Sequence, residues 1–124
     1  MKKRVLSVGQ CGPDNAAIRA FLTRSFDCDF DTADAADDAL SQMKRGKYDL
    51  VLVNRKLDID YSDGTDVIRA LKEDPATSEV PVMLVTNYPE HQEAAIALGA
   101  VHGFGKLEFG KPETRDRLAA ALGA

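Results

Sequence analysis

The 124-residue sequence predicts an α/β fold, in which helices cover both faces of a parallel β-sheet. Three observations support this prediction. Short apolar runs typical of strands alternate with amphipathic helical patterns along the whole chain. The third run, Leu50 to Val53, is continuously apolar, as expected of a central strand buried on both sides. No long linker or large-scale repeat interrupts the alternation, so residues 1–124 are predicted to form a single domain.

The first strand–helix unit begins near the N-terminus. Residues 4–8 (RVLSV) form a short apolar run that predicts a buried strand. Residues 16–26 carry apolar side chains at every fourth position, which places them on one face of a helix. Asp14 or Asn15 is the predicted N-cap of this helix, since both side chains can accept a backbone N–H.

The second unit is more polar than the first, and the third strand follows it. Residues 28–33 alternate apolar and acidic side chains, which predicts a strand close to the sheet edge. Residues 34–47 form a predicted helix that stops at Gly46, with basic side chains in the last turn, where they complement the helix dipole. Residues 48–54 are the most hydrophobic run and therefore predict the central strand.

The last part of the chain completes the alternation. Residues 65–74 have helical periodicity and end before a proline. Residues 80–86 predict a fourth strand, and residues 89–100 predict a helix with a glycine near its end. A fifth strand lies within 101–110, where glycines blur its limits, and residues 112–124 predict a final helix with proline in its first turn.

This order of elements also predicts the topology. Alternating strands and helices in a chain of this length fit the flavodoxin-like, doubly wound (βα)5 arrangement, with a five-stranded parallel sheet in the order 2-1-3-4-5. Ligand sites in such sheets lie outside the C-terminal ends of the strands, where the strand order reverses. The predicted crevice is therefore built from residues 9–15, 54–63, 86–89 and the end of the fifth strand.

Composition excludes several classes of function. The formal net charge is −4 and the basic residues are scattered, which argues against a nucleic-acid partner. No apolar run approaches the roughly 18–20 residues needed to span a bilayer, and the N-terminal apolar stretch is too short for a signal peptide, so we expect a cytoplasmic protein with no membrane partner. Cys11 and Cys28 flank the first predicted helix and are therefore expected to be free thiols.

Several short motifs occur in a characteristic order. They are RVLSV near the start, YDLVLVN followed by Leu57 and Asp63-Gly64, DPATSEVPVMLVTNY, ALGA, and a Lys-Pro pair before the last helix. With these motifs the chain resembles, over its whole length, the receiver domain of two-component response regulators. The resemblance implies a signalling module without enzymatic activity. It also implies a protein partner, such as a histidine kinase or another signalling protein, bound through residues 90–122, with a homodimer as a further option.

Receivers of this family accept a phosphoryl group on an aspartate at the end of the third strand. Two acidic residues after the first strand help to hold Mg²⁺, and a Thr or Ser after the fourth strand contacts the phosphoryl oxygens. In this chain the phosphoacceptor position holds Asn54, the acidic pair falls at Gly9 and Gln10, and Thr86 matches. The resemblance therefore implies a site without its nucleophile or its metal ligands, so we expect no cofactor and weak or absent Mg²⁺ binding.

Two further family positions are shifted in this chain. Receivers carry a lysine after the fifth strand, and spacing from the preceding helix assigns it to Lys106, whereas spacing from the following helix assigns it to Lys111. The sequence leaves this choice open. The aromatic residue that changes rotamer in signalling receivers falls at Gly103, and its neighbours Phe104 and Phe109 are expected to be core residues.

Other carboxylates near the crevice are candidates for cation binding. The segment 58–63 has acidic spacing like that of a calcium loop, but Gly64 comes one place late and a basic residue stands where the bidentate glutamate is needed. The run from the third strand to Gly64 is about two residues longer than in the family pattern, and we expect it to be a solvated turn. Whether Asp14, Asp58 or Asp60 restores any cation binding is open from the sequence alone.

The function predicted from the sequence is that of an atypical, stand-alone receiver in two-component signal transduction. Because an amide is a poor nucleophile, we expect no phosphorylation at Asn54 and a phosphorylation-independent role in protein interaction. One alternative is a redox-sensing domain that uses Cys11. Another is a flavodoxin-like domain that binds phosphate or a nucleotide through residues 9–15. His91 and His102 are expected to be surface residues.

Overall fold

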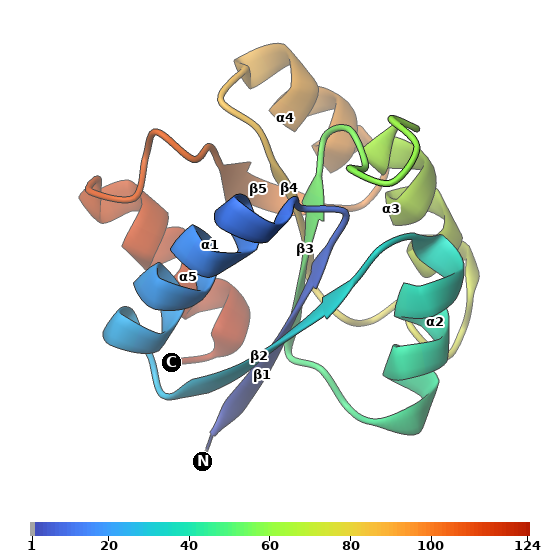
Figure 1. Ribbon diagram of the computed structural model, residues 1–124, viewed down its shortest axis with the longest axis horizontal. Helices are drawn as coiled ribbons and strands as arrows, with labels where there is room; N and C mark the ends of the chain where they lie inside the picture. The colour runs from blue at the N-terminus through green and yellow to red at the C-terminus, as the bar shows by residue number, and fades with distance from the viewer. Residues whose placement is uncertain (1) are drawn as a thin grey trace.

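Five parallel strands form a single sheet in the order β2-β1-β3-β4-β5 (Figure 1), as the sequence predicts. The structure is a computed structural model that describes residues 2–124. The most apolar strand, β3, lies in the centre, and the more polar β2 lies at one edge. The strands are β1 (Lys3–Val8), β2 (Cys28–Ala33), β3 (Leu50–Asn54), β4 (Val82–Val85) and β5 (Val101–Phe104).

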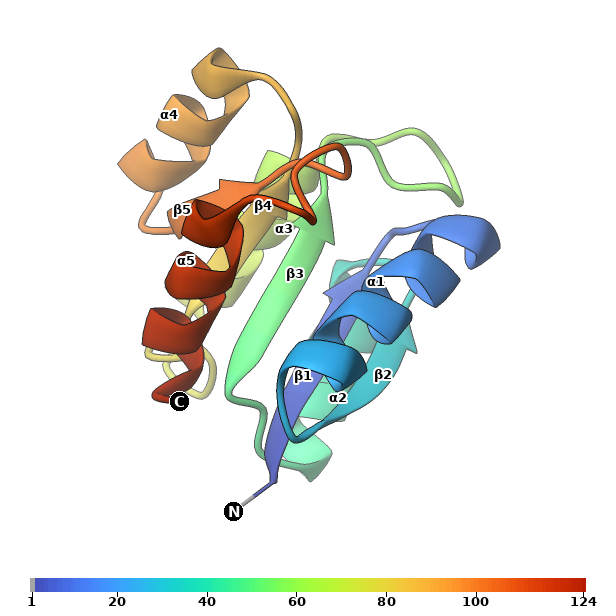
Figure 2. The same ribbon diagram turned by 90° about the vertical axis from the view of Figure 1, so that its left-hand side faces the viewer.

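Helices cover both faces of the sheet (Figures 1 and 2). The first and last helices share one face, and the three middle helices share the other. This division follows from right-handed crossovers in the strand order 2-1-3-4-5. The helices are α1 (Gly12–Ser25), α2 (Ala36–Arg45), α3 (Gly64–Glu73), α4 (Pro89–Ala97) and α5 (Pro112–Leu122).

The core has two parts, one on each face of the sheet. Side chains alternate along each strand, so that in β3 Val51 and Val53 contact the α2–α3–α4 layer while Leu50 and Leu52 contact the α1–α5 layer. All four of these side chains are fully buried. This double burial explains why the strand is continuously apolar, and it fixes the edge of the sheet at which Asn54 emerges.

The largest error in the predicted boundaries concerns α1. The helix begins at Gly12, not at residue 16, and its N-cap residue is Cys11, whose side chain makes no capping hydrogen bond to the described residues. The prediction that Asp14 or Asn15 caps the helix was therefore wrong. Pro13, in the first turn, has a fixed φ that suits a helix start, and it allows the helix to begin earlier.

Two other expectations concern membranes and thiols. Within residues 2–124 the structure has no helix whose length and apolarity would let it cross a bilayer. Cys11 and Cys28 are free, as predicted; Cys28 is buried and Cys11 is partly exposed.

Candidate functional site

Loops from four strands meet at the C-terminal edge of the sheet (Figure 2). Three of the residues predicted to lie at the site are here: Asn54 is the last residue of β3, and Thr86 and Lys106 lie in the loops after β4 and β5. The start of α1 adds Asp14. Hydrogen bonds join Lys106 to both Asp14 and Asn54, so the structure brings these three residues together at the ends of the strands.

Lys106 is at the centre of this network. Its ammonium nitrogen lies 2.6 Å from Asp14 Oδ2 and 3.2 Å from Asn54 Oδ1. The Lys106 side chain is 27% exposed and that of Asp14 is 37% exposed, so the pair is partly shielded from water. The ammonium group thus links α1, the end of β3 and the β5–α5 loop.

Close packing and hydrogen bonds hold the β5–α5 loop, and with it Lys106, in this position. A Cβ at Gly105 would lie 1.7 Å from Asn87 Oδ1, so only glycine allows the backbone to pass this close to the β4–α4 loop. Asn87 Oδ1 in turn accepts the Leu107 N–H at 3.2 Å, and the Gly105 N–H donates to Glu108 Oε1 at 2.7 Å. Together these bonds fix the loop on both sides of Lys106.

The role of Asp14 differs most from the one predicted from the sequence. Instead of capping α1, its carboxylate accepts from Lys106, and this bond holds the pKa of Asp14 below its usual value. Partial burial opposes the shift in the pKa of Asp14, and the nearby Cys11 thiol adds to it. The neighbouring candidate cap, Asn15, accepts from Ser7 Oγ at 2.8 Å and donates to the Gln10 carbonyl at 3.3 Å, which orders the β1–α1 loop.

The side chain of Asn54 uses both ends of its amide. Its nitrogen donates to the Lys56 carbonyl at 2.7 Å and makes a longer contact of 3.5 Å with the Gly9 carbonyl. Its oxygen accepts from Lys106. A carboxylate could not make the same set of contacts, because it would place an oxygen against two carbonyl oxygens. The hydrogen-bond partners of residue 54 therefore favour an amide over a carboxylate.

Gly9 has a positive φ of 78°, and a Cβ there would lie 2.3 Å from Leu57 Cδ2. Leu57 is 2% exposed and occupies the space beside Gly9 into which a side chain would project. The Asp58 N–H also donates to the Gly9 carbonyl at 2.9 Å, which ties the β3–α3 loop to the end of β1. A side chain at Gly9 is disfavoured both by backbone conformation and by packing.

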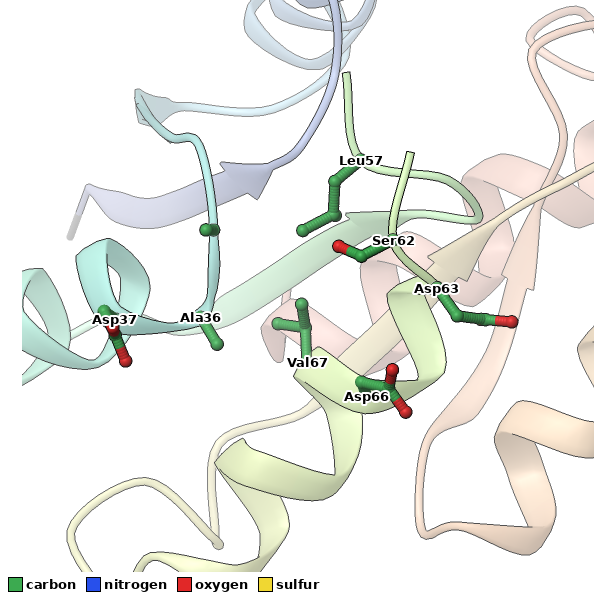
Figure 3. Close-up of a pocket in the computed structure, with 8 residues that line it drawn as sticks. Ala36, Asp37, Leu57, Ser62, Asp63, Asp66 and Val67 are labelled. Atoms are coloured by element: carbon green, nitrogen blue, oxygen red, sulfur yellow. The ribbon is translucent and has the colours of Figure 1, made fainter. Parts of the chain in front are cut away.

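The β3–α3 loop folds back on itself to reach this position. Leu57 N–H donates to Ser62 O, Tyr61 N–H donates to Leu57 O, and Tyr61 has a positive φ of 58°. Below the loop lies a pocket of about 190 Å³, into which Leu57 and Val67 point while Asp63 points away (Figure 3). The predicted solvated turn is thus correct only for the loop tip, because Leu57 is a core residue.

Mg²⁺ prefers hard oxygen ligands in near-octahedral order, commonly one or two carboxylates together with water, and the oxygens at this site are already engaged in other contacts. Gly9 has no side chain, Asn54 offers a neutral oxygen already bonded to Lys106, and the carboxylate of Asp14 is paired with the same ammonium. The side chain of Gln10 is 6% exposed, and its amide has no hydrogen-bond partner among the described residues, but it is neutral. Residues 2–124 contain no cluster of three His, Cys, Asp or Glu side chains placed for a metal ion.

Thr86 belongs to a second chain of hydrogen bonds beside the first. Its hydroxyl oxygen accepts the Tyr88 N–H at 3.3 Å and lies 3.4 Å from His91 Nδ1. His91 Nε2 accepts from Arg55 Nε at 3.1 Å, so Nδ1 carries the proton and donates to Thr86. His91 is partly exposed and hydrogen-bonded on both ring nitrogens, whereas His102 is exposed as predicted.

Lys111 lies outside this network. It is the N-cap residue of α5, its side chain is 58% exposed, and its ammonium is 3.5 Å from Glu108 Oε2. The two predicted core aromatics, Phe104 and Phe109, pack around Phe21 from α1, with Phe104 fully buried and Phe109 partly buried. Of the two candidate lysines, Lys106 is the one that contacts Asn54.

The different environments of the two lysines lead to a testable difference. Lys106→Met should lower the free energy of unfolding by up to about 1 kcal/mol near pH 7, because Asp14 and Asn54 lose their donor while solvent screens the pair. The pKa of Asp14 is lowered by folding, so its stabilising effect is present above the unfolded-state value of about 3.9 and disappears as the pH falls through the lower folded-state value.

Urea denaturation at neutral and acidic pH measures this effect. The matched control is Lys111→Met, whose exposed pair should change stability by less than about 0.5 kcal/mol at any pH. Equal losses for the two variants at neutral pH would contradict the assigned difference between the lysines.

Comparisons with known proteins agree on the family. The family model described as the response regulator receiver domain matches residues 13–122. No curated protein matches the chain. A candidate response regulator from Chloroflexus aurantiacus J-10-fl has a similar structure, with a TM-score of 0.84, 18% identity, and coverage of 100% of both chains.

Two further structures are similar to this chain. The receiver domain of a DNA-binding response regulator from Colwellia psychrerythraea 34H gives a TM-score of 0.79 at 20% identity, over 99% of this chain and 100% of that one. The third structure is the receiver domain of a sensor histidine kinase from Pseudomonas aeruginosa PAO1, which has magnesium coordinated in its active-site cleft. It gives a TM-score of 0.72 at 18% identity, over 100% of both chains. These likenesses show the fold, and the family model identifies the chain: it belongs to the receiver domain family of response regulators.

Proposed function

We propose that this receiver domain does not accept a phosphoryl group at Asn54 and that it acts in two-component signalling as a phosphorylation-independent protein-interaction module. The observation that carries the proposal is the contact of Lys106 with both Asp14 and Asn54. A positive charge supplied by the chain itself lies beside the position of the phosphoacceptor, and a carboxylate of the chain neutralises it.

The chemistry of the amide supports the first half of the proposal. Phosphoryl transfer to a side chain needs a nucleophilic oxygen and a cation that neutralises the charge of the transferring group. Asn54 provides a neutral, weakly nucleophilic oxygen that accepts from Lys106. In the receiver from P. aeruginosa magnesium is coordinated in the cleft. Here Leu57 fills the space beside Gly9, so we propose that Mg²⁺ binds weakly or not at all.

Receiver domains are generally non-enzymatic signalling modules that interact with histidine kinases and other signalling proteins. We propose that this chain likewise has no enzymatic activity and that its partner binds the surface of α4, β5 and α5, within residues 90–122. Two grooves, of about 320 and 360 Å³, flank β5 there and share His102 and Arg117. Ile96 and Val101 are exposed on the same surface and supply apolar contact area. A second copy of this chain is one candidate for the partner.

Treatment with a phosphoryl donor tests the first half of the proposal. The chain is incubated with acetyl phosphate and Mg²⁺, or with beryllofluoride and Mg²⁺, beside a receiver that has the family aspartate as positive control. Intact-mass spectrometry should find no added phosphate, and backbone amide chemical shifts should not change. A hydroxylamine-sensitive phosphate on any carboxylate at the crevice would contradict the proposal.

A further inference from the structure

The pairing of β4 with β5 contains an irregularity. Met83 pairs with Val101 and Val85 pairs with Phe104, so two steps along β4 correspond to three along β5. One extra residue in an otherwise regular ladder is a β-bulge, and a bulge leaves backbone groups without their regular strand partner. This bulge lies in the strand that borders both grooves of the proposed partner surface.

The side-chain amide of Gln92 fills this irregularity. Gln92 lies on α4 and is 5% exposed. Its Oε1 accepts the Gly103 N–H at 2.9 Å, while its Nε2 donates to the carbonyl of Leu84 at 2.9 Å and to that of Thr86 at 3.3 Å. The amide therefore bonds to both strands, as an additional peptide group between them would.

Gly103, which lies in the bulge, leaves room for the Gln92 amide. A Cβ at Gly103 would lie 2.4 Å from the Leu84 carbonyl oxygen and 3.3 Å from Gln92 Oε1. The first contact is with backbone, which cannot rotate away. Glycine is therefore required where the Gln92 amide enters the ladder, and a side chain at Gly103 would separate the strands.

Few apolar side chains hold α4 on the sheet. Gln92 and Ala95 are the buried residues of this nine-residue helix, and Leu98 at its C-terminal end is only partly buried against the core. The neighbouring His91 adds a bond to Arg55 in the β3–α3 loop. A helix with so small an apolar face would open easily without polar anchors, because local stability follows local burial and hydrogen bonding.

We propose that Gln92 is the positioning residue that fixes α4 on β4 and β5 and holds the α4–β5–α5 surface in a single conformation. This inference rests on the proposed function, since it describes the surface that the partner is proposed to bind. That surface is then preorganised, and a partner need not supply the free energy to order it.

Amide hydrogen exchange of the whole chain tests the proposal, with Gln92→Met as the variant. Methionine preserves the length of the side chain but removes all three hydrogen bonds. The Gly103 amide and the amides of α4 should then exchange at least about tenfold faster than in the wild type, relative to the amides of β1 and β3. Unchanged relative protection of these amides would overturn the proposal.

The matched control is Gln42→Met. Gln42 also links a helix to a strand, since its Nε2 donates to the Thr32 carbonyl at 2.9 Å, but it does so from α2 to β2. This variant should leave the exchange of α4 and Gly103 unchanged. Faster exchange there in both variants would indicate a general loss of stability and would overturn the specific role of Gln92.

A measurement on the wild type keeps the proposal testable if Gln92→Met does not fold. The Nε2 protons of Gln92 should exchange slowly with solvent, and the Gly103 amide should show a hydrogen-bond coupling to a side-chain carbonyl. Rapid exchange of the Nε2 protons would overturn the proposal. These readouts need neither partner nor phosphoryl donor, so they succeed or fail independently of the phosphorylation experiment on Asn54.

Discussion

Gly64→Ala is expected to lower the free energy of unfolding by about 3 kcal/mol or more. Gly64 is the first residue of α3, and a Cβ there would lie 2.0 Å from the Asn54 carbonyl oxygen and 3.1 Å from Val53 Cγ1. Its N–H also donates to the Arg55 carbonyl at 2.7 Å. Because the overlap is with backbone, it can be relieved only by moving α3 away from the end of β3.

Chemical denaturation of Gly64→Ala measures this loss, and Gly12→Ala is the matched control. Gly12 is also the first residue of a helix, but a Cβ there meets nothing within 4 Å. Since alanine restricts the unfolded chain more than glycine does, this control should be neutral or stabilising by up to about 1 kcal/mol. If Gly64→Ala were as stable as Gly12→Ala, the close packing of α3 on Asn54 would be disproved.

Gly9→Asp should be similarly destabilising, although it restores an acidic residue that the family has after the first strand. A non-glycine residue at a φ of 78° is strained by about 1 kcal/mol or more, and the new Cβ overlaps Leu57 Cδ2. We expect a total loss of about 3 kcal/mol and no gain in Mg²⁺ affinity, because Lys106 and Asn54 still occupy the crevice.

The double variant with Leu57→Ala separates the two causes of this loss. Shortening Leu57 removes the side-chain overlap but leaves the backbone strain, so Gly9→Asp should cost less in the Leu57→Ala background than in the wild type. Thermal denaturation of the four proteins, with calorimetric titration of Mg²⁺, gives both quantities. Tight Mg²⁺ binding by Gly9→Asp alone would contradict the expectation that Lys106, Asn54 and Leu57 leave no room for the ion.

The strand order could be predicted because it depends on patterns that many residues share. Alternating strands and helices limit the topology to a few choices, and the continuous apolar run before Asn54 marks the central strand. The position of Asn54 at the end of β3 follows directly.

The contacts within the site could not be predicted in the same way. Asp14 was interpreted as a cap because local rules concern neighbours in sequence, whereas its partner, Lys106, is 92 residues away. Gln92 has the sequence appearance of an exposed polar helix residue, and only the bulge between β4 and β5 gives its amide buried partners. The burial of Leu57 was missed because the sequence does not show that the β3–α3 loop folds back on itself, and a long loop is otherwise expected to be exposed to solvent.

The bridge between Lys106 and Asp14 also has a kinetic consequence. The bridge joins the first turn of α1 to the β5–α5 loop across 92 residues of chain, so the entropy cost of closing this loop is offset only when both segments have docked on the sheet. We therefore expect the bridge to form late in folding and to slow unfolding more than it speeds folding.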